Sequence, residues 1–348
     1  MTYLCSMKKV LITGVSGFIA QHCAAQLLHK GYAVKGSVRS TNKQDEIISG
    51  FKNSNIPIEN LEFCTLDLLS DDGWKEAMEE CDYVFHIASP YFIKVPKNEN
   101  DMLRPAIEGT IRALSFAQKA GIKRVVLTSS IVAMIGEDSQ KNKTLNPNNW
   151  TDLDWNEITP YIKSKTKSEK EAWKFIANQK GQHKIELTTI HPGAVYGPTI
   201  TNNLNGESMS MITKLIEGKI PFLPKTAIAV SDVRDIAATH ILAIEKVEAN
   251  NKRLIVTTDK AYSIIELAKI LKKEGFKKVS TIAAPNWLLY FLANFDSEVK
   301  GVIPFVGKSI STDISLTKEV LNWEPIDVRK TILDTAYSAK KALESKKD

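Results

Sequence analysis

The N-terminal part of the sequence is a strand, a glycine-containing turn and a helix in direct succession. Residues 8–13 have the short apolar run of a buried strand, and Gly14 and Gly17 follow it. Apolar residues then recur at four-residue intervals from Ile19 to Leu27, which predicts a helix. Glycines in such a turn let the backbone approach a ligand, and the helix start presents free N–H groups to phosphate. The segment predicts a dinucleotide site, with a purely structural turn as the alternative.

Strand and helix patterns alternate through the following residues. Further strands are predicted at 33–38, 61–66, 83–88, 123–128 and 185–190, and helices at 44–51, 74–81, 102–120 and around 161–165. Repeated strand-helix-strand units with buried strands predict an α/β fold with a doubly wound parallel sheet, the Rossmann type. Such a sheet binds its ligands beyond the carboxyl ends of the strands.

From about residue 202 the alternation weakens. Helices are predicted at 206–218, 233–247, 262–274, 285–295 and 327–342, and a strand at 254–257. We therefore predict a dinucleotide-binding domain over residues 1–200, to which the 232–258 segment returns. Residues 201–348 are expected to form mainly a smaller C-terminal substrate lobe.

Three segments carry more specific structural expectations. Residues 137–155 are polar and are expected to form a surface loop over the core, and residues 191–198 an irregular segment that leaves the sheet. The aromatic and apolar side chains of the 285–295 helix are expected in the core rather than against a substrate: Trp287, Leu288, Tyr290 and Phe291.

Charge and cysteine content exclude several classes of protein. The net charge of +6 is the difference between 46 basic and 40 acidic residues, and the lysines are scattered, so nothing indicates a nucleic-acid partner. The cysteines show no C-x-x-C pair and no metal-ligand spacing, which predicts reduced thiols and no metal site. They are Cys5, Cys23, Cys64 and Cys81.

The N-terminus lacks the long apolar run of a secretory signal, and Met7 is a possible start of translation. The most apolar stretch, residues 287–293, is far shorter than the ~20 residues that a membrane-spanning helix needs. These features predict a cytoplasmic protein without a membrane partner, acting as a monomer or homodimer.

Two basic residues follow the second predicted strand. An acid at this place usually bonds the ribose 2′-hydroxyl of NAD, whereas an arginine accommodates the 2′-phosphate of NADP. Arg39 and Lys43 therefore favour NADP(H), with a basic surface turn as the alternative. After the third strand, Asp67 could accept a hydrogen bond from the adenine amino group beside Leu68, or could act in a turn.

The fourth and fifth strands end in small and hydroxyl side chains. His86 lies inside an apolar strand, which favours a core histidine over a catalytic one. The strand ending in Thr128 is followed by Ser129 and Ser130, and a hydroxyl there could bond a substrate carbonyl. Ser130 is the candidate, with Ser129 as the neighbour if the register differs by one.

Tyr161 and Lys165 are four residues apart on a predicted helix, so the phenol and the ammonium share one face. A free tyrosine titrates near pH ~10, but a neighbouring cation stabilises its phenolate and brings proton transfer closer to neutral pH. The pair could therefore act in acid/base catalysis. Several lysines crowd this segment, so a solvated helix surface is the structural alternative.

The candidate residues fall into three sets. The catalytic candidates are Ser130, Tyr161 and Lys165. The candidates for cofactor binding are Thr13, Gly14, Ser16, Gly17, Phe18, Ile19, Arg39, Lys43, Asp67, Leu68, Ala88, Ser89, Pro90, Thr128, Tyr161, Lys165, Pro192, Gly193 and Val195. Substrate contacts are expected from Ser130, Tyr91 and Tyr196.

Taken together, these motifs resemble the extended short-chain dehydrogenases/reductases over nearly the whole chain. The resemblance rests on Thr13-Gly-x-x-Gly-Phe-Ile, Asp67-Leu, Thr128-Ser-Ser, Tyr161-x-x-x-Lys and His191-Pro-Gly. Within them the chain is most similar to the branch of dihydroflavonol reductases, cinnamoyl-CoA reductases and fungal methylglyoxal/aldehyde reductases. The segments that support this branch are Val84 to Pro90, Pro105 to Thr110, Val233 to Ala238 and the Arg39/Lys43 pair.

The resemblance implies NADPH-dependent reduction of an aldehyde or ketone. It makes Tyr161 the proton donor, Lys165 the residue that lowers its pKa and holds the nicotinamide ribose, and Ser130 the residue that orients the substrate oxygen. Two departures from the pattern stand out: Ala20 replaces the third glycine, and the segment before Tyr161 is shorter than in plant flavonoid enzymes. The second departure argues against a flavonoid substrate.

Two other functions fit parts of the pattern. A nucleotide-sugar epimerase or dehydratase that retains NAD has the same fold, but its dehydratases resemble a pattern with Asp-Glu after the active-site threonine. Here Ser129 and Ser130 follow Thr128, and Arg39 opposes NAD. A non-catalytic NADP-binding regulator is the second alternative, but it has no need of a serine, a tyrosine and a lysine together.

Overall fold

The computed structural model describes residues 7–90, 96, 98–135, 144–156, 158–204 and 206–345. Its centre is a seven-stranded parallel sheet in the order β10-β7-β5-β4-β1-β2-β3. The strands are β1 (Lys9–Ile12), β2 (Ala33–Val38), β3 (Leu61–Thr65), β4 (Tyr83–His86), β5 (Arg124–Thr128), β7 (Glu186–Pro192) and β10 (Arg253–Val256). The predicted doubly wound sheet is therefore confirmed. The strand order reverses between β1 and β4, and ligands bind at such a switch point.

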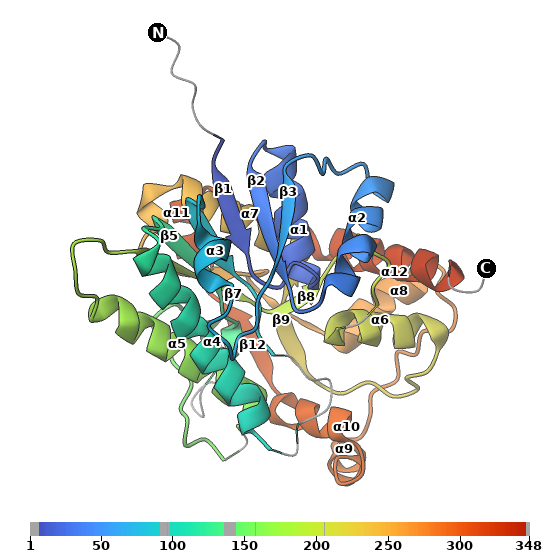
Figure 1. Ribbon diagram of the computed structural model, residues 1–348. Coiled ribbons are helices and arrows are strands. Elements are labelled where there is room, and N and C mark those ends of the chain that lie inside the picture. The colour runs from blue at the N-terminus through green and yellow to red at the C-terminus, as the bar shows by residue number, and fades with distance from the viewer. Residues whose placement is uncertain are drawn as a thin grey trace.

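Helices cover both faces of this sheet (Figure 1). The helices α1 (Phe18–His29), α2 (Gln44–Asn53) and α7 (Val233–Glu245) share one core with Val10 and Ile12 of β1. Leu11 points to the opposite core, which includes residues of α3 (Trp74–Met78), α4 (Asn100–Lys119) and α5 (Pro160–Ala177). Successive residues of β1 thus pack against opposite layers, as side-chain alternation in a strand requires.

A second, five-stranded sheet was not predicted. It has the order β11-β9-β12-β6, with β8 paired to β9. Its strands are β6 (Thr144–Leu145), β8 (Ala194–Tyr196), β9 (Ala227–Asp232), β11 (Ala261–Ser263) and β12 (Ser309–Thr312).

Two loop expectations were wrong in part. The 191–198 segment continues β7 and then forms β8, and the 137–155 segment contains β6, although residues 136–143 lie outside the described ones. β6 has two residues and β8 has three, too few for a periodic pattern.

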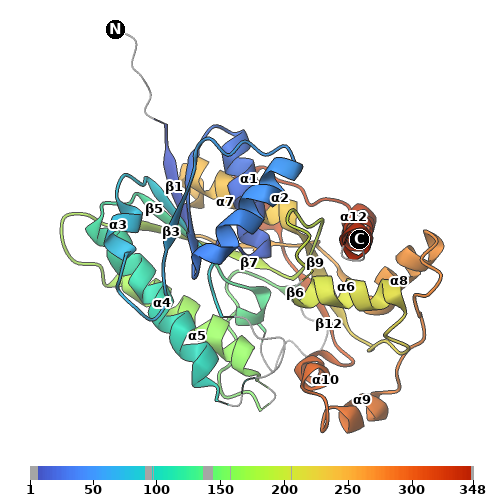
Figure 2. The same ribbon diagram turned by 45° about the vertical axis from the view of Figure 1, so that its right-hand side comes forward.

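Three of the remaining helices form a smaller unit, here called the C-terminal lobe. Residues of α6 (Glu207–Glu217), α8 (Ile264–Lys273) and α12 (Val328–Glu344) share a third core with Tyr196 and Val230. The helix α11 (Ser315–Leu321) packs beside β10. Two short helices, α9 (Asn286–Leu292) and α10 (Ser297–Val302), lie together at the outer edge of the lobe (Figure 2).

The core expectation for the 285–295 helix was wrong. The side chains of Trp287, Tyr290 and Phe291 are 70%, 49% and 56% exposed, and Leu288 is half-buried. Only Leu289 of α9 is buried, in a small cluster with Ala284 and Val306. A seven-residue helix at the edge of a lobe contacts the rest of the protein along one side, so most of its apolar residues face outward.

An ion-pair junction joins the C-terminal helix α12 to the sheet layer. The buried Asp232 carboxylate accepts hydrogen bonds from Arg234 at 2.6 and 2.9 Å and from the Thr331 hydroxyl at 2.8 Å. It also caps α7 by accepting from the backbone N–H of Arg234 at 2.8 Å. Arg234 extends the network to Asp334 at 2.6 Å, whose side chain is 29% exposed.

Removing the buried partner of this junction is expected to cost more stability than removing the exposed one. Asp232→Ala leaves several donors without an acceptor and should lower the free energy of unfolding by about 2–4 kcal/mol. Asp334→Ala removes a solvent-screened partner and should cost about 1 kcal/mol or less. Urea unfolding of both variants measures the difference, and equal losses would contradict the importance given to the buried carboxylate.

Candidate active site

The glycine turn after β1 brings the backbone close to β4. Gly14 has a φ of +70°, and a Cβ built on it would lie 3.0 Å from the Cβ of Ala88. Its N–H donates to the Ser37 hydroxyl at 3.0 Å. Any other residue would be strained here and would press on the end of β4.

Thr13 joins the ends of the two central strands. Its hydroxyl oxygen accepts hydrogen bonds from the backbone N–H groups of Ile87 and Ala88, both at 3.0 Å. It also lies 3.0 Å from Nδ1 of His86. Burial, together with the nearby positive charge of Lys165, lowers the pKa of His86 to about 3, so its imidazole is neutral. This histidine is a buried core residue, as predicted.

The start of α1 is suited to an anion. The helix has no side-chain N-cap and no acidic residue in its first turn, so its first N–H groups are not satisfied by a side chain. Ser16, Gly17, Phe18 and Ile19 all line a large cavity at this point. A diphosphate bound there would meet these N–H groups and the positive end of the helix dipole.

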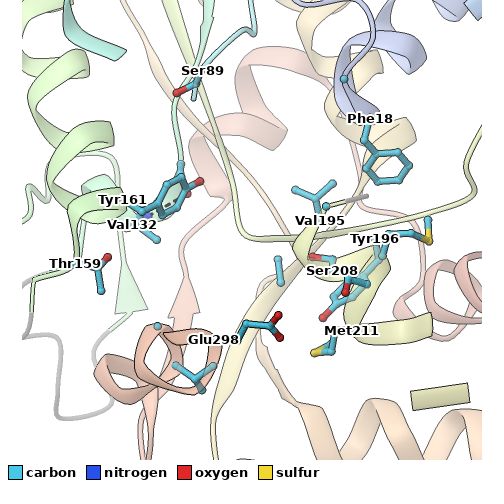
Figure 3. Close-up of a pocket in the computed structure, with 18 of the residues that line it drawn as sticks. Phe18, Ser89, Val132, Thr159, Tyr161, Val195, Tyr196, Ser208, Met211 and Glu298 are labelled. Atoms are coloured by element: carbon cyan, nitrogen blue, oxygen red, sulfur yellow. Dashed lines mark hydrogen bonds between the residues drawn. The ribbon is translucent and has the colours of Figure 1, made fainter. Parts of the chain in front are cut away.

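This cavity has a volume of about 1480 Å³ and runs from the glycine turn to the C-terminal lobe. Figure 3 shows Tyr161 projecting from α5 on one side, and Phe18, Tyr196 and Met211 on the other. A smaller pocket of about 170 Å³ shares several of its walls. Ser130, Tyr161 and Lys165 together line this smaller pocket, so the structure brings the three catalytic candidates to one place.

Every cofactor candidate except Asp67 lines one or both pockets. Asp67 does not line either pocket; its carboxylate accepts the backbone N–H of Leu69 at 2.7 Å, which is the turn role considered as the alternative. Tyr91 lies outside the described residues. Arg39 and Lys43 are exposed at the cavity, and Lys43 pairs with Glu46 at 2.7 Å.

The helix α5 places the phenol and the ammonium. Thr159 caps its start by accepting the Ile162 N–H at 3.3 Å, so the helix begins one residue before Tyr161. Lys165 is buried and donates to the backbone carbonyl of Thr128 at 3.1 Å. Burial lowers the pKa of Lys165 to about 8, although the negative charge of Glu169 acts in the opposite direction.

The structure distinguishes the two serines after β5. Ser129 donates its hydroxyl to the carboxylate of Glu169 at 2.7 Å and is therefore already engaged. Ser130 makes longer contacts, at 3.4 Å to the Pro192 carbonyl and 3.3 Å from the Val132 N–H, and it lines both pockets. Its hydroxyl can exchange these weak contacts for one to a ligand.

Sequence reasoning missed two groups of residues here. One is the wall of the cavity formed by the C-terminal lobe, which includes Met209, Met211, Leu223, Leu289, Glu298, Val299 and Phe305. The other is Glu169, whose position four residues after Lys165 was the available signal.

In the described part of the chain, no group of three or more His, Cys, Asp or Glu could hold a metal ion. No helix described here is long and apolar enough to cross a membrane.

Comparison with known proteins places this site in a family. Residues 10–257 match the model of the NAD dependent epimerase/dehydratase family. The chain belongs to this family, the extended short-chain dehydrogenases/reductases, as its motifs indicate.

Individual relatives show to which branch of this family the chain is most similar. A cinnamoyl-CoA reductase of Medicago truncatula is 34% identical over 76% of this chain and 80% of its own length. An NADPH-dependent methylglyoxal reductase of Saccharomyces cerevisiae is 32% identical over 76% of this chain and 82% of its own. The crystal structure of a yeast methylglyoxal/isovaleraldehyde reductase complexed with NADPH has a TM-score of 0.79 and 26% identity, covering 97% of this chain and 99% of that one. The predicted resemblance to this branch is confirmed.

The burial of the charged Lys165 side chain should lower the free energy of unfolding of the protein. Because its pKa is about 8 in the folded protein and ~10.4 when unfolded, the charged lysine is penalised at neutral pH. Lys165→Met should therefore raise the free energy of unfolding at pH 7 by about 1–3 kcal/mol. Between pH ~8 and ~10.4 the folded wild type loses the proton that the unfolded chain keeps, so this advantage should shrink. Chemical unfolding across this pH range is the measurement, and a Met variant that is less stable at pH 7 would contradict it.

Proposed function

We propose that this protein reduces an aldehyde or ketone to an alcohol with NADPH. The observation that carries the proposal is the pocket of about 170 Å³, where a serine, a tyrosine and a buried lysine meet residues of the expected cofactor site. Relatives over 30% identical are named as reductases, and one is named as NADPH-dependent. The substrate is a small carbonyl compound, and its identity depends on the wall provided by the C-terminal lobe.

In this mechanism the cofactor supplies the hydride and the chain supplies position and a proton. With the hydride supplied by the bound cofactor, Tyr161 would give its phenolic proton to the carbonyl oxygen. The Ser130 hydroxyl donates a hydrogen bond to the same oxygen and holds it near Tyr161. The Lys165 ammonium stabilises the tyrosine phenolate that remains, which brings proton transfer closer to neutral pH.

The cofactor would lie across the sheet edge. The start of α1 would bind the diphosphate, and Arg39 would contact the 2′-phosphate of the adenosine ribose. We further propose that residues 1–200, with the 232–258 segment, form the dinucleotide-binding domain and that residues 201–348 form mainly the substrate lobe. In support, β10 pairs with β7 within the large sheet and α7 packs against α1.

One assay separates the proposed reductase from the two alternative functions, an epimerase or dehydratase and a regulator. The purified protein is incubated with NADPH and a panel of aldehydes and ketones while the absorbance of the reduced nicotinamide is followed. Net oxidation of NADPH supports the reductase. Turnover of a UDP-sugar without net change in the cofactor would instead identify an epimerase or dehydratase. Cofactor binding without turnover of either substrate class would identify a regulator.

The role of Tyr161 gives a direct prediction. Tyr161→Phe removes only the phenolic hydroxyl, so NADPH should still bind with a Kd within about twofold of the wild type. Acid catalysis typically contributes about 10² to 10⁴-fold, and kcat should fall by a factor in this range. Stopped-flow or steady-state kinetics with fluorescence titration of NADPH measures both quantities. Unchanged turnover would refute the assignment.

Cofactor preference gives a second prediction. Arg39→Ala removes a cation expected at the 2′-phosphate and should weaken NADPH binding by about 10- to 100-fold, with little effect on NADH. Lys43→Ala is the matched control, because Lys43 is partly neutralised by its ion pair with Glu46 and should change the Kd less. If Arg39→Ala weakened the binding of NADPH and of NADH equally, the proposed contact between Arg39 and the 2′-phosphate would be refuted.

A further inference from the structure

A buried carboxylate lies on the same helix as Tyr161 and Lys165. Glu169 follows Lys165 by four residues and is 0% exposed. Residues at this spacing lie one above another on one face of a helix. The proposed mechanism uses the first two residues of this face and assigns nothing to the third.

The Glu169 carboxylate collects hydrogen-bond donors from several elements. From the sheet it accepts from Ser129 Oγ at 2.7 Å, His191 Nε2 at 2.9 Å and, more weakly, Thr189 Oγ1 at 3.3 Å. Trp173 of α5 donates from Nε1 at 3.1 Å. The Arg253 guanidinium at the start of β10 completes the set with a contact of 2.8 Å.

These contacts favour the ionised form of the Glu169 carboxylate. Burial alone would raise the pKa of Glu169, but the adjacent His191 and Arg253 outweigh burial and hold its pKa well below the usual range. Glu169 is therefore an ionised carboxylate inside the protein. A buried ion pair is often no better for stability than well-packed apolar residues, so stability alone gives no strong reason for a charge here.

One path from Glu169 leads directly to the serine strand. Ser129 is the residue before Ser130, and its hydroxyl bond to Glu169 ties the end of β5 to α5. The adjacent residue Thr128 is tied to α5 as well, through the Lys165 contact to its carbonyl. Helix and strand are thus linked immediately before Ser130.

A second path reaches the residues after Ser130. Arg253 donates to the carbonyls of Pro147 and, at 2.7 Å, Asn149, and its guanidinium lies 3.8 Å from the centre of the Trp150 ring. The next residue, Thr151, donates its hydroxyl to the carbonyl of Val132 at 2.6 Å and its N–H to that of Ala133 at 2.9 Å. Glu169 therefore reaches the backbone on both sides of Ser130.

We propose that Glu169 is a positioning residue that fixes the Ser130 hydroxyl relative to the Tyr161 phenol, through Ser129 on one side and through Arg253 and the 147–151 segment on the other. This inference rests on the proposed reductase function. Glu169 touches neither substrate nor cofactor in this scheme; it acts through the residues that do.

Glu169 also influences the charge of Lys165. Among the described residues, the titratable groups near this lysine are Glu169 and Tyr161 on its own helix and the neutral His86 on β4. Glu169 supplies the attraction that opposes the effect of burial on the pKa of Lys165. Loss of that attraction should lower this pKa further, so the ammonium would be lost at a lower pH.

The test uses Glu169→Gln, which keeps the shape and removes the charge. A misplacement of about 1 Å can cost up to ~10²-fold in rate, so kcat should fall by about 10- to 100-fold. The Kd of NADPH should stay within about twofold, because the cofactor contacts are not touched. The alkaline limb of the kcat profile should move to lower pH.

A control variant removes an ion pair between β5 and β7, at the strand ends remote from the site. Glu186 at the start of β7 pairs with Arg124 at the start of β5 at 2.5 Å, and Arg124 is 2% exposed. This pair lies at the opposite strand ends from Ser130 and His191. Glu186→Gln should lower the free energy of unfolding but leave kcat and its pH profile unchanged.

Each result decides the proposal. A Glu169→Gln enzyme with normal kcat and an unshifted alkaline limb overturns it, as does a rate loss that Glu186→Gln reproduces. If Glu169→Gln does not fold, the double variant Glu169→Gln/Arg253→Gln, which leaves no unpaired charge, must show the same loss of kcat. If neither folds, Glu169 serves folding and the positioning role is rejected. A wild-type protein that reduces no carbonyl compound would instead refute the proposed function itself.

Discussion

The burial of a lysine ammonium at the carboxyl edge of the sheet is the constraint on which the site depends. Lys165 donates to the carbonyl of Thr128 and has its pKa lowered by the loss of water. This contact requires β5 to end beside the second turn of α5, and it requires a nearby negative charge to keep the lysine protonated. The parallel sheet provides the first condition, and the ionised Glu169 provides the second.

Three consecutive residues at the end of β5 then have three different partners. The Thr128 carbonyl accepts from Lys165, the Ser129 hydroxyl donates to Glu169, and the Ser130 hydroxyl faces both pockets. Two links to one helix therefore precede the residue that is expected to meet the substrate. A strand end held in this way presents a hydroxyl with little freedom, which is what orientation of a carbonyl group requires.

The sequence predicted features whose contacting residues are close together along the chain, and it missed features whose contacting residues are far apart. The strand, glycine turn and helix at Gly14 and the Tyr161–Lys165 pair were predictable because their signals are local. The second sheet was not, because β6 pairs with β12 across a large part of the chain and three of its strands, β6, β8 and β11, have only two or three residues. Glu169 was missed for the same reason: apart from Trp173, its partners lie directly after β5 or on β7 and β10. The exposed aromatic residues of α9 could not be told from core residues by composition, because only the position of the helix at the edge decides their burial.

A crystal structure of the protein with NADP⁺ and the alcohol product of its best substrate tests the central claim most directly. The account predicts the nicotinamide ring in the smaller pocket, with its ribose in contact with Lys165 and the product oxygen within hydrogen-bond distance of both Tyr161 Oη and Ser130 Oγ. A nicotinamide bound elsewhere, or a product oxygen that reaches neither hydroxyl, would contradict it.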